Sequence, residues 1–116
     1  MRYKLDREAQ VTRDLERIYD FLFESYIAFG HGPDAADIAA ADRVIDIEDA
    51  MEMLAEIPHQ GTLYPQLMSG LRSVTKDRAI FYFIVDDEAQ LVRVLAVFFG
   101  GQDHQRLMLR RLLGGA

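Results

Sequence analysis

Basic side chains that can contact phosphate or carboxylate groups lie in the second half of the chain, on or beside segments with strand-like sequences. A guanidinium presents its N–H donors in a planar fork that suits both kinds of anion. The sequence therefore predicts a shallow basic groove that holds a nucleic-acid backbone or an acidic peptide, lined by Arg72, Lys76, Arg78, Tyr82 and Arg93. In the alternative interpretation the arginines pair with the acids of nearby hairpins, Asp77, Asp86, Asp87 and Glu88.

Arg93 differs from the others because it interrupts an otherwise apolar segment, between Val92 and Val94. Burying a guanidinium without a partner costs several kcal/mol. We therefore expect Arg93 either to reach an open face of the sheet or to pair with a carboxylate.

A second candidate is the pair Asp103 and His104 near the C-terminal end. Asp103 suits the N-cap of a helix, where its side chain accepts a backbone N–H. His104 then lies in the first turn, where the helix dipole disfavours the protonated imidazole. Because histidine titrates near neutral pH, His104 is a candidate general acid or base, and the alternative is an ordinary surface histidine.

Three carboxylates, Asp42, Asp46 and Asp49, follow one another at steps of four and three residues. This spacing places them on one face of a helix, which suits a hard cation or a basic partner, but a solvated helix face has the same pattern. The three histidines lack the spacing of metal ligands, and no phosphate-binding loop, nucleophile elbow or HExxH motif is present. We expect no metal and no cofactor.

Composition limits the class of protein. The chain has 116 residues, of which 50% are hydrophobic, and this predicts one folded domain over 1–116. It contains no cysteine, which excludes disulfides and cysteine-bound metals. No apolar run approaches the roughly 20 residues of a membrane helix, and the N-terminal residues lack the apolar core of a signal peptide. We expect a cytoplasmic protein with no membrane partner.

Charge is unevenly distributed along the sequence. The net charge is −6, which disfavours a general nucleic-acid binder. Residues 1–68 hold 6 basic and 14 acidic residues, a net of −8, whereas 69–116 hold 7 and 5, a net of +2. Most of the acid lies in 31–57, where eight acidic residues accompany one base, Arg43. A locally basic surface on residues 72–93 is therefore compatible with the acidic total.

Apolar spacing of three and four residues predicts two helices, over 7–29 and 34–57, joined at Gly30–Pro33 as an antiparallel hairpin. For the first we expect burial on two sides of its C-terminal half and a core side formed by Val11, Leu15, Ile18, Leu22, Tyr26 and Phe29. For the second we expect Asp34 as N-cap. Its predicted core side is Ile38, Ala41, Ile45, Met51, Leu54 and Ile57.

The remaining elements change to a strand pattern. We predict strands over 2–5, 71–74, 78–85 and 91–99, with a loop over 62–70. A break at Gly100–Gln102 leads to a last helix over 104–113, which ends at Gly114–Gly115. The order β-α-α-β-β-β-α predicts an α+β fold with the N-terminal helical hairpin packed on a small, mainly antiparallel sheet.

Six short pieces, in order and at compatible spacing, resemble the RelE/ParE superfamily of toxins from bacterial type II toxin–antitoxin modules, often labelled plasmid stabilisation proteins. The likeness is closer to the ParE branch. The pieces are Tyr3-Lys4-Leu5 with Ile18-Tyr19, Ala50–Gly61, Gly70-Leu71-Arg72, Ala79-Ile80-Phe81-Tyr82, Val92-Arg93-Val94-Leu95 and Asp103.

The resemblance implies a growth-inhibiting toxin that a cognate antitoxin neutralises. For the assembly we expect either a homodimer of the chain or a hetero-oligomer with the antitoxin. ParE-like members poison DNA gyrase by protein contact. RelE-like members cut mRNA in the ribosome, and for that activity the catalytic candidates here are Arg72, Arg78, Arg93 and His104. The net negative charge favours a protein target such as gyrase over RNA. The alternatives are the ribosome-dependent endonuclease and an inactive, binding-only family member.

Overall fold

The computed structural model describes residues 2–100 and 103–114 and has an α+β architecture, as predicted. Gly101, Gln102 and Gly115, which belong to the predicted break and to the predicted end of the last helix, lie outside the described residues. The elements, in order, are β1 (Lys4–Arg7), α1 (Gln10–Ala28), α2 (Pro33–Glu52), the short 3₁₀ helix η1 (Met53–Ala55), β2 (Thr62–Leu63), β3 (Arg72–Lys76), β4 (Ala79–Asp86), β5 (Leu91–Phe99) and α3 (His104–Leu112).

One five-stranded sheet has the order β1-β5-β4-β3-β2. Its mainly antiparallel character is confirmed, because only β1 runs parallel to its neighbour, with Lys4 opposite Leu91 and Arg7 opposite Val94. The first strand lies two residues later than predicted, and β2 forms within the segment predicted as a loop. Parallel neighbours need a long crossover. The helical hairpin and the strands after it provide this connection.

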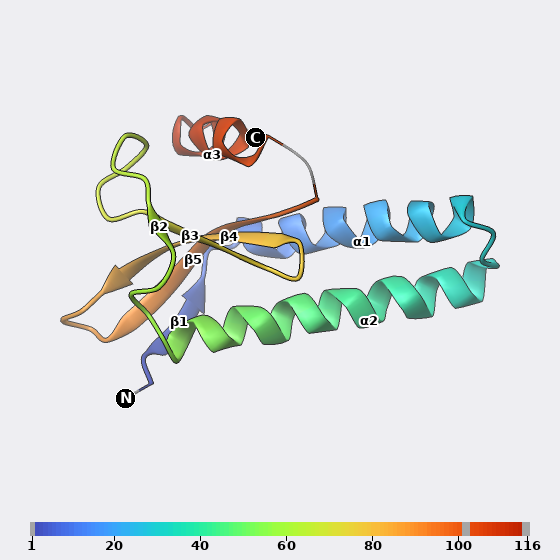
Figure 1. The fold of residues 1–116 in the computed structure, drawn as a ribbon, viewed down its shortest axis with the longest axis horizontal. Helices are drawn as coiled ribbons and strands as arrows, with labels where there is room; N and C mark the ends of the chain where they lie inside the picture. Colours follow the sequence, from blue (N-terminus) through green and yellow to red (C-terminus); the bar gives the residue numbers. More distant parts are fainter. Residues whose placement is uncertain (1, 101–102, 115–116) are drawn as a thin grey trace.

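The two faces of the sheet are covered by different helices (Figure 1). The α1–α2 hairpin covers one face with a core that joins Val11, Leu15 and Ile18 to Phe81 and Phe83. On the other face α3 lies across a smaller cluster formed by Leu71, Ile80, Tyr82, Ala96 and Met108. Burial of these apolar side chains is the main force that holds the layers together.

The core side predicted for the second helix is confirmed at Met51 and Leu54, which are buried, but differs from the observed one earlier in α2. Ala36, Ala40 and Ile47 are fully buried, whereas Ile38 is 63% and Ile45 53% exposed. Small alanine side chains let α1 and α2 approach closely, so the isoleucines are left on the outer side. Ile57 is also exposed, because α2 and η1 end before it.

The hairpin connection agrees with the prediction at its first end and departs from it at the second. Gly30 ends α1 with a φ of 101°, as expected of a glycine C-cap. Gly32, not Asp34, is the N-cap of α2, with Pro33 in the first turn. Phe29 is 85% exposed and Phe21 is also exposed, so the predicted burial on two sides is wrong. The reason is visible in Figure 1, where the far half of the hairpin extends past the end of the sheet.

Candidate functional site

The five residues predicted to line one basic groove are divided between the two faces of the sheet. Arg72 pairs with Phe83 and Lys76 with Ala79, and directly paired residues of antiparallel strands point to the same face. Phe83 and Ala79 belong to the core under the hairpin. Tyr82 belongs to the cluster under α3, on the opposite face. The structure therefore does not bring these residues together in one groove.

Arg93 pairs with a carboxylate, which is one of the two outcomes predicted for it. Its Nε lies 3.3 Å from Oδ2 of Asp6, the residue directly opposite on β1. The carboxylate thus comes from the neighbouring parallel strand and not from the acidic hairpins. Because the Arg93 side chain is 42% exposed, the pair is a surface ion pair of small energetic weight.

Arg78 lies at the other end of the sheet, in the turn between β3 and β4. Both turn residues have positive φ, 51° at Asp77 and 67° at Arg78. The guanidinium groups of Arg78 and Arg43 each lie 5.5 Å from the ring centroid of Phe99, within cation–π range. Arg93 and Phe99 are six positions apart on β5, about 20 Å at the rise of a strand. Arg78 and Arg93 therefore cannot contact one phosphate together.

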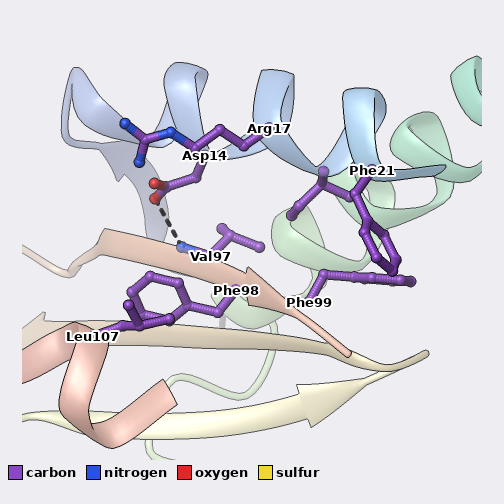
Figure 2. Close-up of a pocket in the computed structure, with 8 residues that line it drawn as sticks. Asp14, Arg17, Phe21, Val97, Phe98, Phe99 and Leu107 are labelled. Carbon is purple, nitrogen blue, oxygen red and sulfur yellow. Dashed lines mark hydrogen bonds between the residues drawn. The ribbon is translucent and has the colours of Figure 1, made fainter. Parts of the chain in front are cut away.

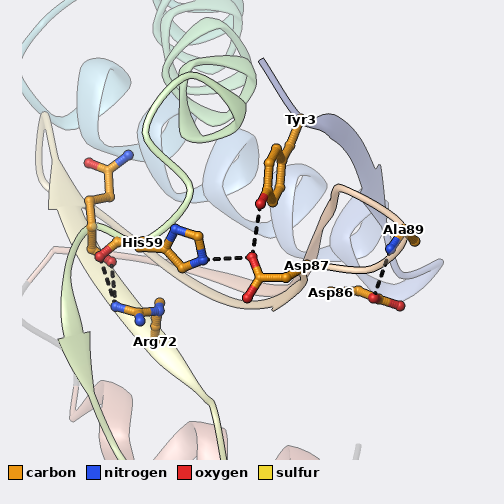
Figure 3. A network of polar contacts seen from close by, with 7 residues as sticks. Tyr3, His59, Arg72, Asp86, Asp87 and Ala89 are labelled. Atoms are coloured by element: carbon orange, nitrogen blue, oxygen red, sulfur yellow. Dashed lines mark hydrogen bonds and ion pairs between the residues drawn. The ribbon is translucent and has the colours of Figure 1, made fainter. Parts of the chain in front are cut away.

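Arg72 is part of a polar network at the edge near the N-terminus (Figure 3). Its Nη1 donates to the carbonyl oxygen of His59 at 2.9 Å, and the ring Nε2 of His59 lies 2.7 Å from Oδ1 of Asp87. The hydroxyl of Tyr3 donates to the same carboxylate oxygen at 2.9 Å. The hydrogen bonds from Tyr3 and His59 hold the pKa of Asp87 below its usual value.

This network joins three distant segments: the N-terminal residues, the chain after η1 and the β4–β5 hairpin. Sequence reasoning identified Arg72 but not Tyr3, His59 or Asp87 as partners, because they are brought together only by the parallel placement of β1 beside β5. The guanidinium of Arg72 is held by backbone carbonyls rather than by the hairpin acids proposed as its alternative partners.

His104 is placed by a hydrogen bond to Tyr82. The phenol oxygen of Tyr82 lies 2.7 Å from Nδ1 of His104. Burial first, and then the nearby Tyr64 and Asp103, raise the pKa of Tyr82 to about 12. The phenol is therefore protonated at neutral pH and lies within hydrogen-bond distance of the imidazole. Asp103 is the N-cap of α3, as predicted, and accepts the backbone N–H of Arg106 at 3.3 Å.

Sequence reasoning did not find the buried ion pair that fixes α3. Arg111 donates from Nη2 to Oδ1 of Asp14 at 2.6 Å and from Nη1 to the carbonyl of Leu95 at 3.0 Å. Asp14, only 3% exposed, also accepts the backbone N–H of Val97 at 3.0 Å. The two residues are 97 positions apart, and each resembles an ordinary surface charge of an amphipathic helix.

The pair satisfies a stretch of β5 that has no neighbouring strand on its β1 side. β1 pairs only with Leu91–Val94, so β5 has no β1 partner beyond that point. The register with β4 places Tyr82 opposite Ala96 and Phe83 opposite Val94, which makes Leu95 the extra residue of a β-bulge. Asp14 thus accepts the N–H of Val97 and Arg111 donates to the C=O of Leu95, two backbone groups that have no partner on a neighbouring strand.

A cleft of about 200 Å³ lies beside this stretch, between α1, β5 and the start of α3 (Figure 2). Its lining combines apolar and aromatic side chains with the two charged residues Asp14 and Arg17. Phe21 and Phe99 meet at its end, with ring centroids 6.2 Å apart. The carboxylate in the cleft already has its hydrogen-bond partners, so the cleft offers an apolar surface more than a reactive group.

Two further observations concern the described residues only. They include no group of three or more His, Asp or Glu side chains close enough to hold a metal ion. Among the helices of residues 2–100 and 103–114, none combines the length and the hydropathy that a membrane span requires.

Solved structures similar to this chain were found, whereas no sequence family was. No protein-family model and no curated protein matches the chain. A chain of the chromosomal ParDE toxin–antitoxin system from P. aeruginosa is 22% identical with a TM-score of 0.60, over 84% of this chain and 95% of that one. A chain of the RelBE2 toxin–antitoxin complex from Mycobacterium tuberculosis is 17% identical with a TM-score of 0.55, over 88% and 95%.

A mutant of the E. coli toxin RelE in the free state is 13% identical with a TM-score of 0.56, over 96% of this chain and 97% of RelE. The chain therefore has the RelE/ParE toxin fold, as its sequence pieces predicted. The identity and the TM-score are higher for the ParDE chain than for these two, in line with the predicted likeness to the ParE branch.

Proposed function

We propose that this protein is the toxin of a type II toxin–antitoxin module, acts in the cytoplasm and is held inactive by a cognate antitoxin. The support is a fold shared with ParDE, RelBE2 and RelE chains over 84–96% of this chain and 95–97% of those chains. The shared fold thus extends over most of both chains in each comparison. Six sequence pieces in matching order support the same proposal.

We further propose that the toxin acts by binding a protein target, such as DNA gyrase, rather than by cutting RNA. A site for phosphodiester cleavage needs cations that converge on one phosphate. The candidates for that role lie apart: Arg72 is held by the carbonyl of His59, Arg78 lies over Phe99 and Arg93 is paired with Asp6. This dispersal is the observation on which the proposal rests, and the net charge of −6 agrees with it.

The test is controlled expression in bacteria. Expression of the chain alone should arrest growth, and co-expression of the product of the neighbouring reading frame should restore it. The His104→Ala variant should remain toxic under the proposed mechanism, because His104 then serves only to place α3. Harmless expression of the wild-type chain would contradict toxicity and favour a binding-only protein. Loss of toxicity in a folded His104→Ala variant, together with ribosome-dependent mRNA cleavage by the wild type, would favour the endonuclease.

A further inference from the structure

The seam between α1 and α3 holds two adjoining hollows. The first is the cleft of about 200 Å³ that ends at the rings of Phe21 and Phe99 (Figure 2). The second is a smaller pocket of about 40 Å³, lined by Gln10, Arg13, Asp14, Arg17 and Arg111. Asp14 and Arg17 line both hollows, so one molecule can extend from the pocket into the cleft.

The smaller pocket is positively charged. Three guanidinium groups, at Arg13, Arg17 and Arg111, face one carboxylate, Asp14, which leaves a net charge of +2. Both oxygens of that carboxylate are used: Oδ1 accepts from Nη2 of Arg111 at 2.6 Å, and Oδ2 accepts the N–H of Val97 at 3.0 Å. Asp14 is therefore balanced by Arg111, and the charges of the other two arginines remain.

Arg13 and Arg17 have no carboxylate within ion-pair distance in residues 2–100 and 103–114. They are four residues apart on α1, about one helical turn, so their side chains leave the helix on the same side. Planar guanidinium groups bind carboxylate and phosphate oxygens with strong, charge-assisted hydrogen bonds. A pocket of about 40 Å³ has room for such a group, because a single water needs only about 10–15 Å³.

The larger cleft suits a flat apolar group. Besides Asp14 and Arg17 its lining is aliphatic and aromatic, and consists of Ile18, Phe21, Val97, Phe98, Phe99 and Leu107. The guanidinium of Arg111 also lies 5.8 Å from the ring centroid of Phe98, so the charged and aromatic parts of the seam are in contact. An apolar cavity of about 150 Å³ can hold benzene, so a cleft of about 200 Å³ accepts one aromatic ring with a short substituent.

Size and charge together select the occupant. Pockets for drug-sized ligands have volumes of about 300–1,000 Å³, so this cleft takes a smaller molecule with a single ring. The two arginines at one end require that the molecule carries a negative group, and the aromatic walls require that the rest is apolar.

We propose that the seam between α1 and α3 binds a small aromatic anion, with its ring in the cleft and its carboxylate or phosphate group beside Arg13 and Arg17. The site is independent of the proposed function, which assigns no role to this seam. Because Arg111 belongs to α3 and the other two arginines to α1, the bound anion joins the two helices and stabilises the folded chain.

The test is an NMR titration of the full ¹⁵N-labelled chain with four probes. Phenylacetate and phenyl phosphate carry a ring and an oxyanion, benzyl alcohol carries the ring without the charge, and inorganic phosphate carries the charge without the ring. The reporters are the backbone amides of residues 13–21 and of Val97, whose N–H is bonded to Asp14.

Two variants, each with a matched control, locate the site. Arg17→Gln removes a cation of the pocket, and Arg2→Gln makes the same change of charge at the N-terminal edge. Phe21→Ala removes a wall of the cleft, and Phe29→Ala removes a phenyl ring from the far end of the same hairpin. The two phenylalanines are 54% and 85% exposed, so both variants should fold.

At least one aromatic anion should cause saturable shifts at Val97 and in residues 13–21, and the tighter of the two identifies the natural group as a carboxylate or a phosphate ester. Arg17→Gln and Phe21→Ala should each weaken binding by roughly tenfold, as should loss of the charge or of the ring from the probe, while the control variants bind like the wild type.

Three results would overturn the proposal. The first is no saturable shift with either aromatic anion. The second is equal binding of benzyl alcohol and the anions, which would show that the arginines do not take part. The third is a peptide ending in phenylalanine that binds about 100-fold more tightly than phenylacetate, which would assign the cleft to a protein chain.

Discussion

The helices on the two sides of the sheet are attached in different ways. α3 has nine residues and is fixed by specific polar contacts: the buried Asp14–Arg111 pair and the Tyr82–His104 hydrogen bond. The α1–α2 hairpin is twice as long per helix and is held by apolar packing, while its outer side exposes isoleucines and carboxylates. The comparison shows that a short helix with a single fully buried apolar residue, Met108, depends on specific polar contacts. The longer hairpin is held by the apolar core on its inner side and leaves its outer side exposed.

The largest effect should follow from loss of the buried ion pair. Asp14→Ala leaves the guanidinium of Arg111 without its carboxylate and the backbone N–H of Val97 without a partner. A buried pair broken on one side costs about 3–5 kcal/mol. Urea denaturation should show a loss of this size, against a change within about 0.5 kcal/mol for the exposed control Arg110→Ala. A small effect of Asp14→Ala would mean that α3 is not secured by this pair.

A smaller loss of stability should follow when the hydroxyl of Tyr82, under α3, is removed. Tyr82→Phe removes the hydrogen bond to His104 and should cost about 1 kcal/mol in the free energy of unfolding. Because the folded pKa is raised to about 12 from 10.0, Tyr82 contributes stability that is present below pH 10 and is lost as pH rises toward 12. Denaturation at several alkaline pH values should show this loss in the wild type and a flatter curve in Tyr82→Phe. Identical curves for the two proteins would contradict the placement of the phenol.

The polar network at the N-terminal edge should respond to acid instead. The pKa of Asp87 is lower in the folded protein than the ordinary 3.8, so its contribution is present above pH 3.8 and is lost as pH falls through the folded value. Asp87→Asn should therefore flatten the acid limb of the stability curve. NMR titration of the Asp87 carboxyl gives the direct value, and an ordinary or raised pKa would show that Tyr3 and His59 do not bind it in solution.

The smallest effect should come from the outer side of the hairpin. Ile45→Ala removes a side chain that is mostly in solvent, so the free energy of unfolding should change by less than about 0.5 kcal/mol. Ile47→Ala, two positions away and fully buried, should cost about 2–5 kcal/mol. The ratio of the two losses, measured by urea denaturation, sharpens the contrast between the sides of α2. Similar losses would show that Ile45 takes part in the core.

The sequence was sufficient for the fold but not for the arrangement of the site. Periodicity located every helix and long strand within a few residues, because each has apolar positions at its own spacing. It correctly placed Met51 and Leu54 in the core but wrongly placed Ile38 and Ile45 there, since isoleucines outweigh alanines in hydrophobicity while close helix packing prefers alanine. Asp14 with Arg111, and Tyr3 with Asp87, are distant pairs that tertiary structure alone brings together. The pairing of Arg93 with a carboxylate was one of two predicted outcomes, because an unpaired guanidinium in an apolar strand is costly.

The most direct test of the account compares two activities of the purified chain. DNA gyrase supercoiling and cleavage of mRNA on programmed ribosomes are measured side by side at the same toxin concentrations. A toxin directed at a protein, with basic residues that do not converge on one phosphate, should inhibit supercoiling and leave the mRNA intact. Cleavage of ribosome-bound mRNA with supercoiling unaffected would contradict the account.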